Sequence, residues 1–123
     1  MGLDFSHGDA HWAYSGFGRF RERLAATVGI PLLRMRGFCK YGDGEGIEWP
    51  VSDEPLLILL HHSDCDGELT PDECRKIARR LRDVVEFWND VMHPGQDYDR
   101  ANALKLADGM DSAAKENLPL KFF

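Results

Sequence analysis

The chain contains 123 residues, the size of one domain, so we expect residues 1–123 to fold as a single domain. Hydrophobic residues make up 43% of it and charged residues 29%, which are values of globular proteins and exclude a disordered or low-complexity chain. The 15 basic and 21 acidic residues give a formal net charge of −6, which argues against a general nucleic-acid-binding protein.

Nothing in the sequence indicates secretion or membrane insertion. No apolar run approaches the roughly 20 residues that a membrane-spanning helix needs, so no membrane contact is expected. The first four residues lack the basic and apolar regions of a secretory signal. Cys39, Cys65 and Cys74 are an odd number of cysteines without CxxC spacing, which favours reduced thiols over a disulfide framework. We therefore expect a cytoplasmic protein.

The first expected helix covers residues 15–28. Its apolar positions recur every three or four residues, as on one face of a helix, and charged residues fill the remaining positions. The apolar set is Tyr14, Phe17, Phe20, Leu24 and Val28, and the charged set is Arg19, Arg21, Glu22 and Arg23. Gly29 and Ile30-Pro31 then provide a stop signal. Alternating residues predict a short strand at 37–41, followed by a glycine-rich acidic loop at 42–46.

The apolar run at residues 56–60 is too short for its periodicity to assign. Its leucines and the N-cap signal of Ser52-Asp53 favour a buried helix, with a buried strand as the alternative. Thr70-Pro71-Asp72-Glu73 is a clearer signal, a capping box with proline at the first helical position. An apolar stripe follows and ends at His93-Pro94-Gly95, so a helix is expected over about residues 71–92. The stripe is Cys74, Ile77, Ala78, Leu81, Val84, Val85, Trp88, Val91 and Met92.

The last helix is expected from about Tyr98 to Lys115, with five residues facing inward: Ala101, Leu104, Ala107, Met110 and Ala114. Pro119 prevents the helix from continuing, so residues 118–123 are expected to form an extended tail that pairs with residues 3–5 or with 37–41. The sequence therefore predicts a mainly α, small single domain of three to four helices with a minor short-stranded β element, or alternatively an α+β fold.

The segment HHSDCDGE at residues 61–68 carries the densest cluster of polar side chains. Aligned with the calcium loop of an EF-hand, it places Gly67 at the position where the chain turns sharply, and Leu69 at the apolar position that faces the core. A helix begins where the motif requires one. The spacing predicts an EF-hand-like cation loop at residues 62–73, with five candidate ligands: His62, Asp64, Asp66, Glu73 and the backbone carbonyl of Glu68.

His62 departs from this motif because the first position is normally an aspartate, and Ca²⁺ prefers oxygen ligands. We therefore expect weak binding of Ca²⁺, with Mg²⁺ as an alternative ion. The same residues also have an explanation that needs no metal. Asp66-Gly67 is a common turn pair, and Glu73 completes the capping box of the following helix. The sequence supports both interpretations.

A zinc or manganese site is the second alternative. His7 and His11 are four residues apart, which places them on one face if the segment is helical. They would combine with donors from the 61–68 segment in a metal-dependent hydrolase, whose candidate ligands are His7, His11, His61, His62 and Asp64. This arrangement requires residues 7–11 to approach residues 61–66. No GxSxG, P-loop or GxGxxG motif supports another enzyme class.

A third alternative is a metal-free protein-interaction module, in which Trp49 and the glycine-rich loop contact a partner protein. The expected helix at 71–92 also carries five basic residues: Arg75, Lys76, Arg79, Arg80 and Arg82. Opposite charges lie four positions away in three pairs, Asp72–Lys76, Arg79–Asp83 and Arg82–Glu86. A salt-bridged solvent face is therefore expected, and no nucleic acid is expected as a partner.

Three stretches of the chain carry a resemblance. They are residues 2–7 with 13–21, residues 62–69 (HSDCDGEL) with the capped helix that follows, and residues 108–122. Together they resemble a family of small uncharacterised bacterial and bacteriophage proteins, and the central octapeptide is the most specific part. The resemblance implies a phage or prophage setting and brings no assigned activity. The function expected first is that of a non-enzymatic accessory or binding protein with a cation loop.

Overall fold

The computed structural model describes residues 2–35, 46–50, 52–63, 66–91 and 93–123. These residues form four α-helices, α1 (Tyr14–Thr27), α2 (Leu56–Leu60), α3 (Pro71–Val85) and α4 (Gln96–Lys115), and one 3-10 turn, η1 (Leu32–Arg34). They also form four short strands, β1 (Leu3–Asp4), β2 (His11–Trp12), β3 (Glu68–Leu69) and β4 (Leu120–Lys121). The predicted mainly α fold with a minor β element is confirmed. None of these helices combines the length and the apolar content that crossing a membrane requires.

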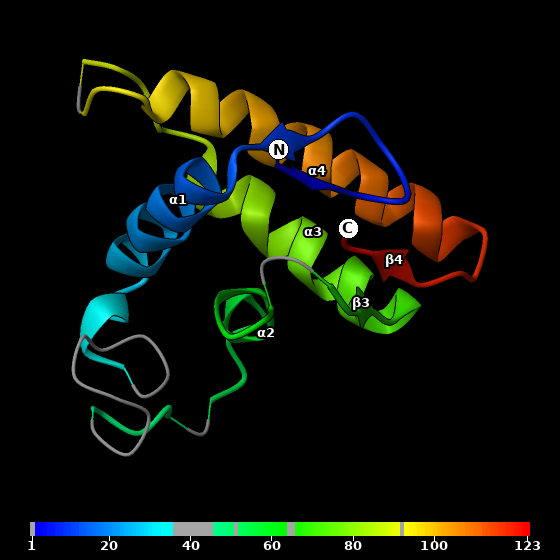
Figure 1. The fold of residues 1–123 in the computed structure, drawn as a ribbon, viewed down its shortest axis with the longest axis horizontal. Helices are drawn as coiled ribbons and strands as arrows, with labels where there is room; N and C mark the ends of the chain where they lie inside the picture. Colours follow the sequence, from blue (N-terminus) through cyan, green and yellow to red (C-terminus); the bar gives the residue numbers. More distant parts are fainter. Residues whose placement is uncertain (1, 36–45, 51, 64–65, 92) are drawn as a thin grey trace.

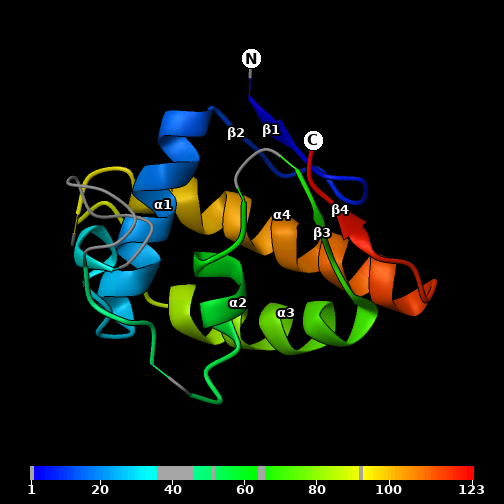
Figure 2. The same cartoon turned by 60° about the horizontal axis from the view of Figure 1, so that its bottom comes forward.

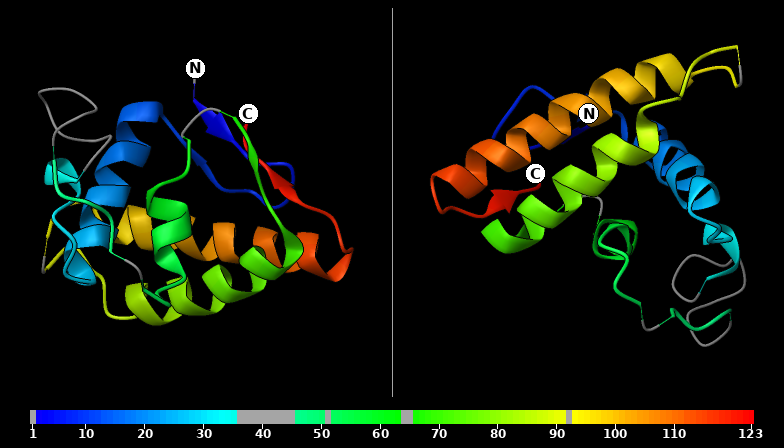
Figure 3. Two further views of the ribbon diagram at one scale, coloured as in Figure 1. Left: turned by 90° about the horizontal axis from the view of Figure 1, so that it is seen from below. Right: turned by 180° about the vertical axis from the view of Figure 1, so that it is seen from behind.

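The α3–α4 hairpin is the longest feature of the molecule (Figure 1). The two helices pack closely because α3 has one apolar face and α4 presents mostly small residues to it. The buried residues include Cys74, Ile77, Ala78, Leu81 and Val85 of α3, and Ala103, Leu106, Ala107, Met110 and Ala113 of α4. α1 lies across the end of the hairpin where α4 begins (Figure 2). α2, the helix expected at 56–60, packs against α3 (Figure 3).

Two strand pairs bring the chain ends together. β1 pairs with β2, and β3 pairs with β4, both antiparallel. A bridge between Phe5 and Phe122 joins the two pairs, so the ends of the described chain lie close to each other (Figure 2). Pairing of the tail with residues 3–5, one of the two expected partners, is confirmed. The strand expected at 37–41 lies outside the described residues.

An aromatic cluster joins the N-terminal strands to α1. The indole of Trp12 stacks on Phe20 with ring centroids 4.6 Å apart, and Phe5 contacts both Trp12 and Phe122 edge-on. Trp12 is 1% exposed, and its Nε1 donates to the buried carboxylate of Asp99 at 3.2 Å. The short strands are therefore part of the core, because their aromatic side chains fill the space between α1 and the chain ends.

Some expectations about the helices are wrong. α3 ends at Val85 instead of continuing as far as expected, and Val91, expected inside, is 94% exposed. Other bonds replace those of a further helical turn. The Val85 carbonyl accepts from the Trp88 amide and from Nε of Arg100 in α4, both at 3.1 Å, and the Asn89 amide donates to Oε1 of Gln96 at 3.2 Å. Tyr14 and Ala101, both expected to face inward, are exposed.

Candidate functional site

The turn between α2 and α3 contains most of the candidate ligands (Figure 2). Gly67 adopts a φ of +85°, the left-handed conformation that its place in the calcium-loop alignment predicts. Leu69 is 1% exposed, as expected for the apolar position that faces the core. The Phe122 amide donates to the Gly67 carbonyl at 3.0 Å, beside the β3–β4 pair. The turn is therefore attached to the C-terminal tail.

His62 reaches across this turn and contacts two backbone carbonyls. Its Nδ1 is 2.8 Å from the Ser63 oxygen, and its Nε2 is 3.2 Å from the Glu68 oxygen. A neutral imidazole has only one N–H, so both contacts are hydrogen bonds only when the ring is an imidazolium. The ring also packs against Phe122, with centroids 4.1 Å apart. His62 therefore contacts the same Glu68 carbonyl that the alignment assigns to a cation.

Glu73, the candidate for the bidentate ligand, forms the expected capping box. Its Oε1 accepts from the Thr70 amide at 2.9 Å, and Thr70 Oγ1 accepts from the Glu73 amide at 3.2 Å. Asp66 is exposed, and Asp64 and Cys65 lie outside the described residues. Across the described ranges, no group of three or more His, Cys, Asp or Glu side chains is placed to hold a metal ion. The contacts of Glu73 agree with the metal-free interpretation of the turn.

Arg21 of α1 also belongs to this site, although the sequence pattern places it among the charged residues that fill the positions outside the apolar set. Its side chain is buried, and Nη1 donates to the carbonyls of Leu60 at 3.2 Å and His62 at 2.5 Å. These carbonyls lie at the end of α2, where a helix leaves such groups without internal partners. The guanidinium also lies over the Phe17 ring at 4.8 Å. A signal was present, because position 21 falls between Phe17 and Leu24 on the apolar face.

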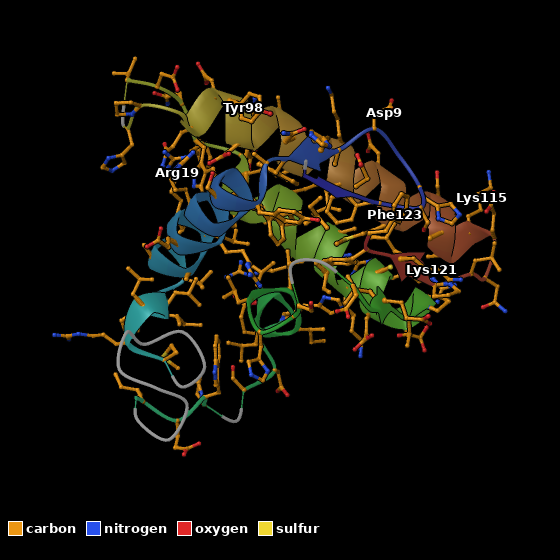
Figure 4. The ribbon with its side chains drawn as sticks, viewed as in Figure 1. Asp9, Arg19, Tyr98, Lys115, Lys121 and Phe123 are labelled. Atoms are coloured by element: carbon orange, nitrogen blue, oxygen red, sulfur yellow. The ribbon has the colours of Figure 1, made fainter. Side chains whose placement is uncertain are left out.

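The other candidate histidines contact separate partners. His7 lies 2.9 Å from Glu116, His11 lies 2.7 Å from Asp4, and the His61 ring packs against Trp49. The N-terminal loop that carries Asp9 lies over α4 (Figure 4). Within the part of the chain that the structure describes, residues 7–11 and 61–63 do not converge on a shared metal-binding group. The zinc or manganese alternative therefore gains no support from the described histidines.

Cys74 lies at the start of α3 and is fully buried. Its Sγ is 3.8 Å from the Leu69 carbonyl. Burial raises the pKa of this thiol from 9.0 to about 11. The thiol is therefore protonated at neutral pH, and it is not a nucleophile there because only the thiolate attacks. Cys74 is a core residue rather than a reactive group.

The basic face of α3 is not neutralised in the predicted way. Among the described residues, none of the three expected i,i+4 ion pairs forms within 4.0 Å. Arg82 instead binds Asp108 and Asp111 of α4, at 2.8 and 2.7 Å, and Arg80 binds Glu54 at 2.9 Å. The predicted pairs are wrong because Arg80 and Arg82 reach carboxylates on neighbouring segments, although ion pairs of Arg75, Arg80 and Arg82 do form on this face. Sequence spacing within one helix does not contain that information.

Comparisons of this chain with known protein families, with curated proteins and with solved structures find no match. The structure shows a mainly α domain in which His62 is bound by Arg21 of α1 and Gly67 is bound by the C-terminal tail. The resemblance to bacteriophage proteins and the cytoplasmic location stay predictions from the sequence.

Proposed function

We propose that this protein is a non-enzymatic binding domain, in which the turn at residues 62–73 is a structural support that needs no bound cation. One observation carries the proposal. Three of the five candidate ligands are engaged with protein groups, since His62 contacts the Glu68 carbonyl and the Glu73 carboxylate accepts the Thr70 amide. The His62 ring therefore occupies the side of the Glu68 carbonyl that a bound cation would need.

The surroundings of the turn also support binding over catalysis. The Cys74 thiol is buried and protonated, and His7 and His11 each contact one carboxylate near the chain ends. In contrast, Phe87 and Val91 are 80% and 94% exposed in the segment between α3 and α4. These two side chains offer apolar surface that a partner protein could cover. Trp49, the contact residue expected from the sequence, is partly buried against the core.

Metal analysis tests this proposal. Protein purified without chelator is measured for bound elements and is then titrated with Ca²⁺ and with Zn²⁺ in a calorimeter. We expect substoichiometric metal after purification and no heat of binding for either ion at submillimolar concentration. Stoichiometric zinc would favour the hydrolase alternative and overturn the binding role. Stoichiometric calcium that Asp66→Ala removes would contradict a turn that needs no cation.

A weak Ca²⁺ or Mg²⁺ site is the second candidate function, because two features of the alignment agree with the structure. Gly67 is left-handed and Leu69 faces the core. For an ion to bind there, Nε2 of His62 must leave the Glu68 carbonyl. His62→Asp supplies a carboxylate at the first position, so this candidate predicts tighter calcium binding in that variant. His61→Asp adds the same charge outside the aligned loop and is the matched control.

A further inference from the structure

A shallow groove lies between the start of α2 and the exposed face of α3. Its volume is about 330 Å³, and it is lined by Pro55, Arg75, Lys76, Arg79, Arg80 and Asp83. Basic side chains dominate the lining, with Asp83 as its acidic member, although the whole chain has a net charge of −6. Positive charge is therefore concentrated at this groove against the overall balance of the protein.

Two of the four cations have no counter-charge in the described part of the chain. Arg75 and Arg80 each pair with a carboxylate, at 2.6 and 2.9 Å. Lys76 and Arg79 are exposed, and no carboxylate oxygen of the described residues lies within 4.0 Å of either head group. They are three positions apart on α3, which places them side by side on one face of the helix.

We infer that this groove binds a short acidic segment of a partner protein, with Lys76 and Arg79 as the cations that meet its carboxylates. The inference rests on the binding role proposed above and names the chemistry of the partner. Lys76 and Arg79 can bind carboxylates of the partner without breaking an existing ion pair, so the pairs of Arg75 and Arg80 stay in place. Pro55 and the methylene stems of the basic side chains add apolar contact between the charges.

The surroundings of the groove favour a peptide over a nucleic acid. Nucleic-acid binding normally neutralises a run of phosphates with many basic side chains along an extended path. Here the two free cations lie within one turn of α3, and carboxylates flank them at Asp72, Asp83 and Asp111. A long polyanion would meet these carboxylates and the net charge of −6. A short segment with two or three acidic residues meets only the groove.

The test measures fluorescence anisotropy of a short labelled peptide of alternating glutamate and alanine, at about 50 mM salt where screening is weak. The wild type is compared with Lys76→Gln/Arg79→Gln. The matched control is Arg19→Gln/Lys105→Gln, which removes the same charges from exposed residues of α1 and α4. We expect the groove variant to bind about tenfold more weakly than the wild type. We expect less than about a twofold change in the control, because those residues lie outside the groove.

Four outcomes would overturn the inference. Equal binding by the wild type and the groove variant would show that the peptide binds elsewhere, and the proposed binding role would stand without this groove. Equally tight binding of single-stranded DNA with the same charge would show a general polyanion surface. No binding of the acidic peptide by the wild type would remove the inference, while the metal measurements would still decide the proposed function. Equally tight binding of an uncharged peptide of alternating glutamine and alanine would show that the carboxylates do not cause the binding.

Discussion

The two ends of the α3–α4 hairpin are closed by different kinds of contact (Figure 1). Where α3 begins and α4 ends, backbone pairs connect the chain: β3 pairs with β4, and the Asp4 amide donates to the Phe123 carbonyl at 2.8 Å. At the opposite end, where α3 leads into α4, a charged side chain makes the connection. Arg23 of α1 binds the carboxylate of Asp99 and the carbonyl of Pro94.

This difference determines which substitutions each end tolerates. Backbone hydrogen bonds survive most side-chain changes. At the end with the strand pairs, a substitution should therefore lower stability mainly where an added side-chain atom would push packed segments apart. A buried ion pair depends on both partners, because removing one leaves the other without its counter-charge. We therefore expect the largest loss of stability from one substitution at the end where α3 leads into α4 (the loop end). Losses should be smaller at the end with the β3–β4 pair (the strand end).

The buried carboxylate of Asp99 gives the largest expected effect. It is 3% exposed, accepts from Trp12 Nε1 and pairs with Arg23. Asp99→Ala leaves both donors without this acceptor, so we expect a loss of about 3 kcal/mol in the free energy of unfolding, measured by urea denaturation. Asp97→Ala, an exposed change in the same first helical turn, is the control. Equal losses in the two variants would contradict a structural role for the Asp99 pair.

Gly109 of α4 lies against the backbone of the N-terminal loop, near the strand end of the hairpin. A Cβ built on it would lie 2.3 Å from the His7 carbonyl oxygen, so Gly109→Ala must push the N-terminal loop away from α4. We expect a net loss of about 2 kcal/mol by thermal unfolding, after the gain in helix propensity is included. Gly18→Ala in α1 is the matched control, because nothing lies within 4 Å of its added Cβ. That variant should gain up to about 1 kcal/mol, and a similar gain at Gly109 would disprove the close packing.

The capping box gives a smaller effect at the same end. Thr70→Ala removes the oxygen that accepts the Glu73 amide, and N-cap substitutions of this kind cost about 1 kcal/mol. Ser112→Ala, an exposed change in α4, should stay within about 0.5 kcal/mol of the wild type. Chemical denaturation of the two variants side by side gives the comparison. A neutral Thr70→Ala would mean that the β3–β4 pair alone fixes the start of α3.

The Cys74 thiol gives an effect that is absent at neutral pH. Burial raises its pKa to about 11, from 9.0. The unfolded thiol therefore ionises first, so the stabilising effect of the neutral buried thiol is complete below pH 9 and is lost as the pH rises towards 11. We expect the wild type to lose more stability than Cys74→Ala between these pH values, measured by urea denaturation. Parallel pH profiles of the two proteins would contradict the burial effect.

The features that the sequence predicted correctly depend on residues that are close together in the chain. Thr70 and Glu73 form the capping box because both members lie within one helical turn. The positive φ at Gly67 follows from a local turn that disfavours other residues. The helix at 56–60 and the mainly α fold depend on the same kind of short-range signal. For this reason the start of α3 is predicted well.

The features that the sequence missed depend on contacts between distant segments. Arg21 is buried because it binds the carbonyl of Leu60 at the end of α2. Arg82 pairs with Asp108 of α4 instead of a residue of its own helix. At the end of α3, Arg100 binds the Val85 carbonyl and Gln96 takes the Asn89 amide that a longer helix would have used. The contact of His62 with Glu68 requires the turn to be closed, although both residues were singled out as ligands. Spacing predicted the capping-box partners of the turn but not the contact of His62 with the Glu68 carbonyl.

Thermal unfolding in Ca²⁺ and in EGTA, for the wild type, His62→Phe and His61→Phe, tests the closure of the turn most directly. Phenylalanine keeps a ring against Phe122 but removes the polar contacts of His62 with the Ser63 and Glu68 carbonyls. We expect equal wild-type melting temperatures in both buffers, a decrease of about 4 °C in His62→Phe in both, and no change in His61→Phe. A wild-type melting temperature that rises with calcium, together with loss of that rise in Asp66→Ala, would contradict this expectation.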